Sequence, residues 1–160
     1  MNAEEVLLTF KKRKLTLGSV ESVTAGLFGS SICSIPGASE VYLGGLITYD
    51  PKEKINLAKV DPQTIASHSV VSPEVAKEMA IGGRKVLGVD VCVSATGSAG
   101  PTVCPGGAEV GTIYLAIADK TQVKVIPLHL HGARNAIRLE TVNKMIDAVV
   151  EFVSDSSVRS

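Results

Sequence analysis

The sequence contains no tryptophan, and its three tyrosines and three phenylalanines make up only 4% of 160 residues. With so few aromatic side chains, a core has to be built from Val, Ile, Leu and Ala, which is typical of buried parallel strands covered by helices. Hydrophobic residues still reach 45% of the chain, and this excludes an intrinsically disordered protein. The length suits one domain, so we expect a single domain over residues 1–160.

The sequence also lacks an excess of charge, because sixteen basic residues balance sixteen acidic ones. No charged field therefore points to nucleic acid or an anionic membrane as the partner. No hydrophobic run approaches the roughly 20 residues that cross a bilayer. The N-terminus shows no basic region followed by an apolar core, as a signal peptide would. We expect a cytoplasmic protein whose partner is a small molecule.

The sequence has only three cysteines, Cys33, Cys92 and Cys104. They form no CxxC motif, and any single disulfide would leave one cysteine unpaired. This favours a reducing compartment. Cys33 and Cys92 lie in apolar stretches and are predicted to be small core residues. Cys104 lies in a Gly/Pro loop that could leave it exposed, but no neighbouring histidine offers to activate it.

Hydrophobic periodicity predicts five helices, over residues 3–14, 25–34, 51–57, 73 to about 88, and from about 134 onward. It predicts five strands, over residues 15–21, 41–49, 89–95, 111–118 and 123–130, the last two as a hairpin. We expect residues 61–69 to be a polar connection and the chain to fray after Phe152. This order predicts an α/β fold, a three-layer α/β/α sandwich with one mixed sheet and helices on both faces.

Three predicted loops follow strand ends, at Ser22, Tyr49 and Thr96. In open α/β sheets ligands bind outside the carboxyl ends of the strands, so chemistry is expected there. A serine at Ser22 becomes a nucleophile only if a neighbouring base takes its proton. The alternative is that Ser22 only caps the next helix, for which Thr24 is also a candidate cap.

Lys54 follows Pro51 by about one helical turn, so it can point back toward the strand ends. A lysine acts as a general base when burial lowers its pKa from about 10.4 toward 7. Tyr49, at the strand end, is placed to orient Lys54 or to relay a proton. The alternative is a solvated helix of alternating charge.

Two small-residue segments, 96–101 (Thr-Gly-Ser-Ala-Gly-Pro) and 105–107 (Pro-Gly-Gly), bracket one loop. Small residues let backbone N–H groups approach a phosphate or an oxyanion, but a tight structural turn explains them equally well. His129 and His131 share one face of a strand end, and His68 is the only other histidine. No third ligand is evident near the pair, so we expect no metal site.

Taken in order, seven segments resemble the motifs of one family. The first four are residues 21–26, similar to E-S-C-T-G-G; residues 35–39, similar to V-P-G-S-S; Thr48-Tyr49 with Lys54, matching T-Y-x-x-x-x-K; and His68 with residues 70–72, similar to H-G-A-V-S. The others are residues 96–101, similar to T-G-I-A-G-P; residues 110–112, matching V-G-T; and residues 132–134 with Arg138, similar to G-D-R followed by arginine. Together they identify a resemblance to the CinA C-terminal family over about residues 18–150, in the form without the further domain that longer CinA proteins carry.

The resemblance implies an amidase that converts nicotinamide mononucleotide to nicotinic acid mononucleotide and ammonia, with Ser22 as nucleophile and Lys54 as base, and with Tyr49 and Thr96 beside them. It implies no metal or organic cofactor, and it leaves homo-oligomer formation possible. Candidate substrate contacts are Thr24, Gly26, Gly97, Gly100, Gly106, Gly107, Arg134 and Arg138, of which either arginine could meet the phosphate. The alternatives are an amidase for another amide and a binding module without turnover.

Four residues depart from the family motifs: Val23 for cysteine, Ala25 for glycine, Pro51 for asparagine and Ala133 for aspartate. Ala25 adds a methyl group where backbone could approach substrate, and Pro51 fixes the turn that aims Lys54. Ala133 removes a carboxylate that could orient a neighbouring arginine. None of the four removes a proposed catalytic group.

Overall fold

The five strands form one mixed sheet in the order β2–β1–β3–β4–β5, in a computed structural model that describes residues 1–155. The strands are β1 (Leu17–Glu21), β2 (Tyr42–Ile47), β3 (Val91–Gly97), β4 (Thr112–Ala118) and β5 (Val123–His129). The first three are parallel, and β4 and β5 follow as an antiparallel hairpin. The predicted α/β fold is confirmed.

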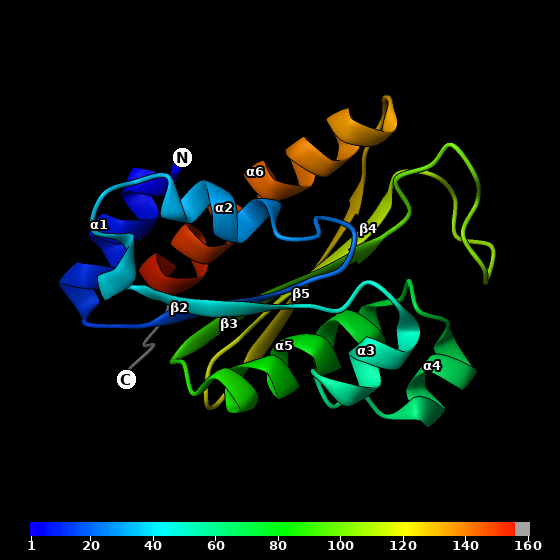
Figure 1. Ribbon diagram of the computed structural model, residues 1–160, viewed down its shortest axis with the longest axis horizontal. Helices are drawn as coiled ribbons and strands as arrows, with labels where there is room; N and C mark the ends of the chain where they lie inside the picture. The colour runs from blue at the N-terminus through cyan, green and yellow to red at the C-terminus, as the bar shows by residue number, and fades with distance from the viewer. Residues whose placement is uncertain (156–160) are drawn as a thin grey trace.

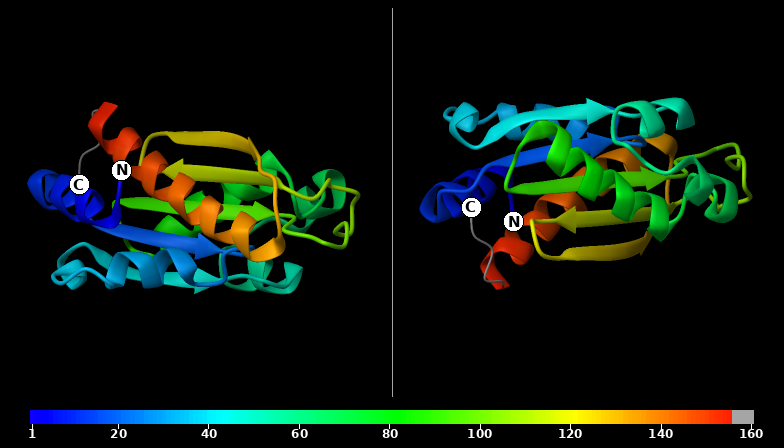
Figure 2. Two further views of the ribbon diagram at one scale, coloured as in Figure 1. Left: turned by 90° about the horizontal axis from the view of Figure 1, so that it is seen from above. Right: turned by 90° about the horizontal axis from the view of Figure 1, so that it is seen from below.

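Helices cover both faces of the sheet (Figure 1). One face carries α1 (Ala3–Arg13), α2 (Leu27–Cys33) and α6 (Arg134–Asp155), and the other carries α3 (Pro51–Asn56), α4 (Pro62–His68) and α5 (Pro73–Leu87). A short 3-10 turn, Ala38–Glu40, precedes β2. Figure 2 shows α6 running across one face of the sheet and α5 across the other. The three-layer sandwich is therefore as predicted.

Helix starts follow from local side-chain chemistry. The Ser72 hydroxyl accepts a hydrogen bond from the Val75 N–H at 3.2 Å, and Pro73 occupies the first turn of α5. Asp50 caps α3 in the same way, through the Lys52 N–H at 2.8 Å, with Pro51 in the first turn. This cap fixes the direction in which α3 leaves the end of β2, and with it the place of Lys54.

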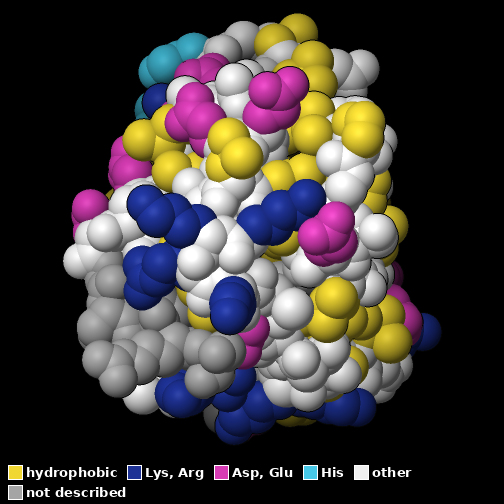
Figure 3. Space-filling view, turned by 90° about the vertical axis from the view of Figure 1, so that its left-hand side faces the viewer, with side chains coloured by type: hydrophobic (Ala, Val, Ile, Leu, Met, Phe, Trp, Pro, Cys, Tyr) yellow, Lys and Arg dark blue, Asp and Glu magenta, His cyan; other side chains and the backbone are white. Residues whose placement is uncertain are grey.

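The core consists of aliphatic side chains between the sheet and each helix layer. β3 is buried up to Thr96, as the apolar run of residues 89–95 predicts, and β1 is buried along its whole length although it contains Ser19 and Glu21. Lys11, Lys12 and Arg13 lie in the last turn of α1, where their positive charges complement the negative end of the helix dipole. Figure 3 views the end of the molecule opposite the carboxyl ends of the parallel strands, and there basic, acidic and hydrophobic side chains are interspersed.

Two expectations about the chain are wrong, those for residues 61–69 and for Cys33, whereas the expected fraying after Phe152 falls mostly on residues outside the described part. Residues 61–69 are not an irregular connection but contain α4, which Asp61 caps through the Gln63 N–H at 2.8 Å. No residue of α4 is fully buried and only Ile65 packs against the core, so its sequence has no apolar periodicity to detect. α6 continues past Phe152 to Asp155, and residues 156–160 lie outside the described part. Cys33 is exposed, whereas Cys92 is buried as expected and Cys104 is partly buried.

Within residues 1–155, no helix combines the length and the hydrophobicity that a membrane crossing requires.

Candidate active site

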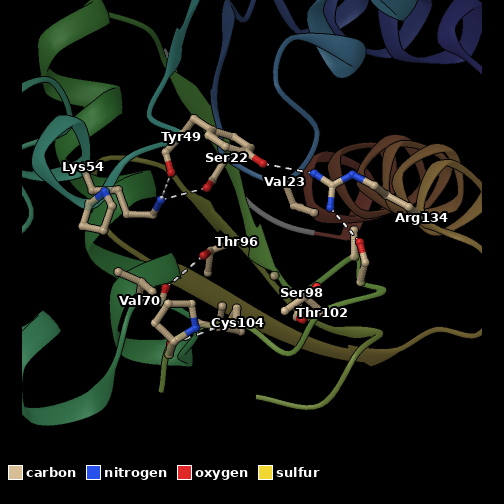
Figure 4. A pocket seen from close by; sticks show the side chains of 16 residues that line it. Ser22, Val23, Tyr49, Lys54, Val70, Thr96, Ser98, Thr102, Cys104 and Arg134 are labelled. Carbon is tan, nitrogen blue, oxygen red and sulfur yellow. Dashed lines mark hydrogen bonds between the residues drawn. The ribbon is translucent and has the colours of Figure 1, made fainter. Parts of the chain in front are cut away.

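A pocket of about 270 Å³ opens where the carboxyl ends of β1, β2 and β3 meet (Figure 4). All three predicted loops contribute to it, because parallel strands bring their carboxyl ends to one edge of a sheet. The lining includes Ser22 and Val23 after β1, Tyr49, Pro51 and Lys54 after β2, Val70 and Val71 before α5, Thr96 to Gly100 at the end of β3, Cys104 in the following loop, and Arg134 at the start of α6.

Ser22 and Lys54 meet inside this pocket. The Lys54 Nζ lies 2.8 Å from the Ser22 Oγ and 2.7 Å from the backbone oxygen of Thr48. Lys54 is 2% exposed and Ser22 is 7% exposed. The alternative of a solvated helix therefore does not describe Lys54, whose amine lies in the pocket and not in bulk water.

Burial changes the acid–base behaviour of Lys54. Desolvation lowers the pKa of its ammonium from 10.5 to about 8, and the Asp50 carboxylate opposes this shift only in part. Both oxygens within 3 Å of the Nζ are neutral, so no close carboxylate holds the amine in its charged form. The lowered pKa makes about a tenth of the amine neutral at pH 7, far more than for an ordinary lysine, and the neutral amine is the form that acts as a general base.

Tyr49 contributes through two different groups. Its backbone oxygen lies 3.4 Å from the Lys54 Nζ, but its phenol oxygen accepts a hydrogen bond from Arg134 Nη2 at 3.0 Å. Arg134 Nη1 also donates to the backbone oxygen of Gly100 at 2.7 Å. In Figure 4, Lys54 and Arg134 lie on opposite sides of the pocket, with Ser22 and Val23 between them. The Tyr49 side chain is thus directed to Arg134 and not to Lys54.

Thr96 lines the pocket without contacting the Ser22–Lys54 pair. Its hydroxyl donates to the backbone oxygen of Val70 at 2.9 Å and so connects β3 to the wall formed by Val70 and Val71. Because the hydroxyl hydrogen is used in this bond, the structure gives Thr96 a role in shaping the wall. Its oxygen keeps lone pairs that can still accept a hydrogen bond.

The start of α2 has a different cap from the one expected. Gly26 occupies the N-cap position and the Thr24 hydroxyl has no partner, so the prediction of Thr24 as cap is wrong. The carboxylate of Glu21 takes this role, accepting from the N–H groups of Gly26, Phe28 and Gly29 at 3.1, 2.9 and 3.1 Å. An anion is therefore already present at this helix N-terminus, and it comes from the protein itself.

Glu21 was missed as a functional residue because its carboxylate acts on N–H groups five to eight positions later. Such contacts depend on how the chain turns after β1, and residue spacing alone does not reveal them. A glutamate at a fully buried strand end is nevertheless a detectable signal, because buried carboxylates need several donors.

Arg138 lies one helical turn after Arg134 but does not line the pocket. Its Nε donates to the backbone oxygen of Val23 at 3.0 Å, and its Nη2 lies 3.3 Å from that of Thr24. The two candidate phosphate ligands are thus separated by the fold: Arg134 reaches the pocket, and Arg138 holds the turn that follows Ser22.

The small residues proposed as substrate contacts also fall into two groups, those that line the pocket and those that do not. Gly97 and Gly100 line the pocket, whereas Gly26, Gly106, Gly107 and Thr24 are not part of its lining. At Gly106 an added Cβ would overlap the Ser69 hydroxyl, so the small size of Gly106 allows the two loops to lie against each other. Gly97 is similar, because a side chain there would meet Ile113 and the backbone of β4.

Several polar groups around Ser22 have no partner within residues 1–155. The buried hydroxyls of Thr24, Thr48 and Ser98 are unpaired there. The N–H groups of Val23 and Thr24 likewise have no backbone or side-chain acceptor in that range. Ser98 and Val23 also line the pocket, so some of this unused hydrogen-bonding capacity lies next to the space a ligand would fill.

The histidines lie away from this arrangement. His68 lies 3.7 Å from Glu74, and the rings of His129 and His131 are 4.9 Å apart. Among residues 1–155, no group of three or more His, Cys, Asp or Glu side chains is arranged to hold a metal ion.

Comparisons with known proteins find relatives of this chain. A family model described as the CinA C-terminal domain matches residues 1–153. A CinA-like protein from Chlorobaculum tepidum is 42% identical over 138 residues, which cover 82% of this chain and 33% of that protein. A putative competence-damage inducible protein from Thermoanaerobacter sp. (strain X514) is 39% identical over 150 residues, which cover 94% of this chain and 36% of that protein. The chain spans about a third of the length of the curated relatives it matches.

Solved structures show the same fold. A CinA superfamily protein from Klebsiella pneumoniae superimposes with a TM-score of 0.93 at 25% identity, over 96% of both chains. A competence/damage inducible protein from Agrobacterium tumefaciens superimposes with a TM-score of 0.89 at 27% identity, over 92% of this chain and 91% of that one.

Proposed function

Because the chain belongs to the CinA C-terminal domain family, we propose that it is an amidase that converts nicotinamide mononucleotide to nicotinic acid mononucleotide and ammonia. The observation that carries the proposal is the buried Lys54 amine, 2.8 Å from the Ser22 hydroxyl in a pocket at the strand ends. A serine paired with a lysine of lowered pKa is a recognised arrangement for nucleophilic attack on a carbonyl.

In the first half of the reaction, the Ser22 Oγ attacks the carboxamide carbon and the neutral Lys54 amine takes the hydroxyl proton. The tetrahedral intermediate then collapses, the C–N bond breaks, and the Lys54 ammonium returns the proton to the departing ammonia. An ester between Ser22 and the nicotinoyl group remains. The 2.8 Å contact is short enough for direct proton transfer in both directions.

In the second half, water attacks the ester carbon and Lys54 takes a proton from that water. The bond to Ser22 breaks, the serine recovers its proton from Lys54, and nicotinic acid mononucleotide leaves. Over the two halves, the amide and one water give the acid and ammonia, and every transferred proton passes through Lys54. Neither half therefore requires a metal or an organic cofactor.

The oxyanion formed in both halves needs hydrogen-bond donors near Ser22. The Val23 N–H is the best-placed candidate, because Val23 directly follows the nucleophile, lines the pocket and has an N–H without an acceptor within residues 1–155. An N–H one residue after the nucleophile serves this purpose in other hydrolases. One such donor typically lowers the barrier by about 3 kcal/mol.

Arg134 is the candidate ligand for the phosphate of the nucleotide. It lies across the pocket from Lys54, and its hydrogen-bond partners within residues 1–155 are the Tyr49 phenol and the Gly100 carbonyl, neither of which is a carboxylate. Its positive charge therefore remains available to an anion, and a guanidinium binds phosphate through two parallel N–H groups. The arrangement suits a substrate with an amide at one end and an anion at the other.

The direct test is incubation of the purified protein with nicotinamide mononucleotide, with ammonia and nicotinic acid mononucleotide measured together. The proposal expects equal amounts of the two products. If the nucleotide raises the thermal midpoint but neither product forms, the protein is a binding module and the proposed activity is wrong.

A further inference from the structure

Ser22 lies in the turn between β1 and α2, and hydrogen bonds from two different side chains fix this turn. On one side the Glu21 carboxylate accepts three N–H groups at the start of α2. On the other side the Arg138 guanidinium donates to the carbonyls of Val23 and Thr24. The Ser22 N–H also donates a hydrogen bond to the backbone oxygen of Ala95 in β3, at 3.1 Å.

These contacts fix the orientation of the peptide groups next to the nucleophile. In a trans peptide the C=O and the N–H point in opposite directions. When Arg138 holds the Val23 carbonyl toward α6, the Thr24 N–H is turned away from α6. The Ser22 carbonyl, which accepts from the Ala25 N–H at 3.1 Å, fixes the Val23 N–H in the same manner.

We propose that Arg138 is a positioning residue for the Ser22 nucleophile: by holding the Val23 and Thr24 carbonyls, it keeps the Ser22 hydroxyl at Lys54 and orients the adjacent N–H groups. The inference rests on the proposed function and gives the two arginines of α6 different tasks. Arg134 binds the anionic end of the substrate, and Arg138 acts through the protein backbone without touching substrate. Nothing in a motif distinguishes two arginines four positions apart on one helix, but their partners do.

The test compares Arg138→Met with Arg134→Met and with a matched control, Arg84→Met. Methionine keeps an aliphatic stem of similar length and removes every donor. Arg84 is also half-buried and also donates to a backbone oxygen, that of Val89 at 3.3 Å, but it lies on α5 away from the pocket lining. Thermal unfolding of all three variants establishes that they are folded before their kinetics are compared.

With nicotinamide mononucleotide as substrate, Arg138→Met is expected to lower kcat at least tenfold with KM changed less than twofold, because a misplaced nucleophile slows chemistry and not binding. Arg134→Met is expected to raise KM at least tenfold, and Arg84→Met to change neither constant. If Arg138→Met raises KM and leaves kcat unchanged, Arg138 is a phosphate ligand and the proposal is overturned. Kinetics identical to those of Arg84→Met would overturn it as well.

A second readout does not depend on turnover. The Lys54 pKa, followed by the pH dependence of its side-chain carbon NMR signals, is expected near 8 in the parent and in Arg84→Met. In Arg138→Met it is expected to rise toward 10.5, because a loosened Ser22 turn lets water reach the amine. If the parent protein fails to hydrolyse the nucleotide, the proposed function fails, and this NMR comparison still decides the role of Arg138: an unchanged Lys54 pKa in Arg138→Met would overturn it.

Discussion

The Lys54 Nζ lies 2.8 Å from the Ser22 Oγ, although the two residues are 32 positions apart in the chain. Each comes to this point because a strand ends there: Ser22 directly follows β1, and Lys54 lies in α3, which begins four residues after β2. Since β1 and β2 are adjacent and parallel, their carboxyl ends meet. The contact is thus a product of sheet topology, and the chemistry of the site depends on the protonation state of Lys54.

The first prediction concerns the pH dependence of activity. The base form of Lys54 is the neutral amine, so kcat/KM is expected to rise about tenfold per pH unit below pH 8 and to level off above it. A rate–pH profile of the parent protein between pH 6 and about 10 measures this. A rate that falls as the pH rises through 8 would show that the ammonium form is the active one.

The same group is expected to make stability depend on pH. The folded-state pKa of Lys54 is lowered, so the unfolded chain binds more protons between about pH 8 and 10.5. Burial of the Lys54 ammonium lowers the free energy of unfolding by its full amount below pH 8. As the pH rises from about 8 to 10.5 this penalty decreases, by about 1.4 kcal/mol per pH unit.

This stability effect is isolated by comparing the parent with Lys54→Met in urea unfolding at several pH values. As the pH rises from 8 to 10, the free energy of unfolding of the parent is expected to increase relative to that of Lys54→Met. Lys52→Met, which removes an exposed lysine from the same helix, is expected to show no such trend. A parallel pH dependence of parent and Lys54→Met would contradict the assigned burial cost.

The third prediction concerns Glu21, which is 2% exposed and accepts from three backbone N–H groups and from the Ser19 hydroxyl. Glu21→Gln replaces one acceptor oxygen by an NH2 group that faces donors, so it is expected to lower the free energy of unfolding by about 3 kcal/mol. Glu40→Gln is the matched control, because the Glu40 side chain makes an exposed ion pair with Lys11, worth about 0–1 kcal/mol. Chemical denaturation of both variants measures the difference, and equal small losses would count against the buried cap.

The fourth prediction concerns backbone strain at Ser69, whose φ of 76° and ψ of 159° fall in a region that suits glycine almost exclusively. Ser69→Gly is expected to stabilise the protein by about 1 kcal/mol, since strain is relieved and no hydrogen bond of the Ser69 hydroxyl is lost within residues 1–155. Ser67→Gly, inside α4, is expected to destabilise by about 0.5 kcal/mol. Unfolding midpoints that fall for both variants would argue against strain at Ser69.

Much of this arrangement is predictable from sequence where a periodic pattern or a strand end carries the information. The apolar residues 89–95 predict a central strand, and β3 lies between β1 and β4. Ser22, Tyr49 and Thr96 each follow or end a predicted strand, which predicts that they lie together, and all three line one pocket. The helix α4 escaped prediction because none of its seven residues is fully buried and a single hydrophobic residue, Ile65, packs against the core, which is too little to form a periodic pattern.

Other features depend on tertiary contacts that no pattern encodes. The Glu21 carboxylate caps α2 across a turn, and Arg138 reaches a turn that lies 114 to 115 positions earlier in the chain. By sequence alone, Arg134 and Arg138 are equivalent phosphate candidates, because they are four positions apart on one helix. Only the placement of the Ser22 turn beside the second arginine separates them.

The central claim, that Ser22 is acylated during the reaction, is tested most directly by rapid quenching followed by mass spectrometry of the peptide that contains Ser22. With nicotinamide mononucleotide, the parent protein is expected to show a transient mass increase on this peptide, with ammonia released in a burst of about one equivalent per site. Ser22→Ala is expected to show neither the adduct nor turnover. Ammonia release by Ser22→Ala at the parental rate, without an adduct on the parent, would contradict the account.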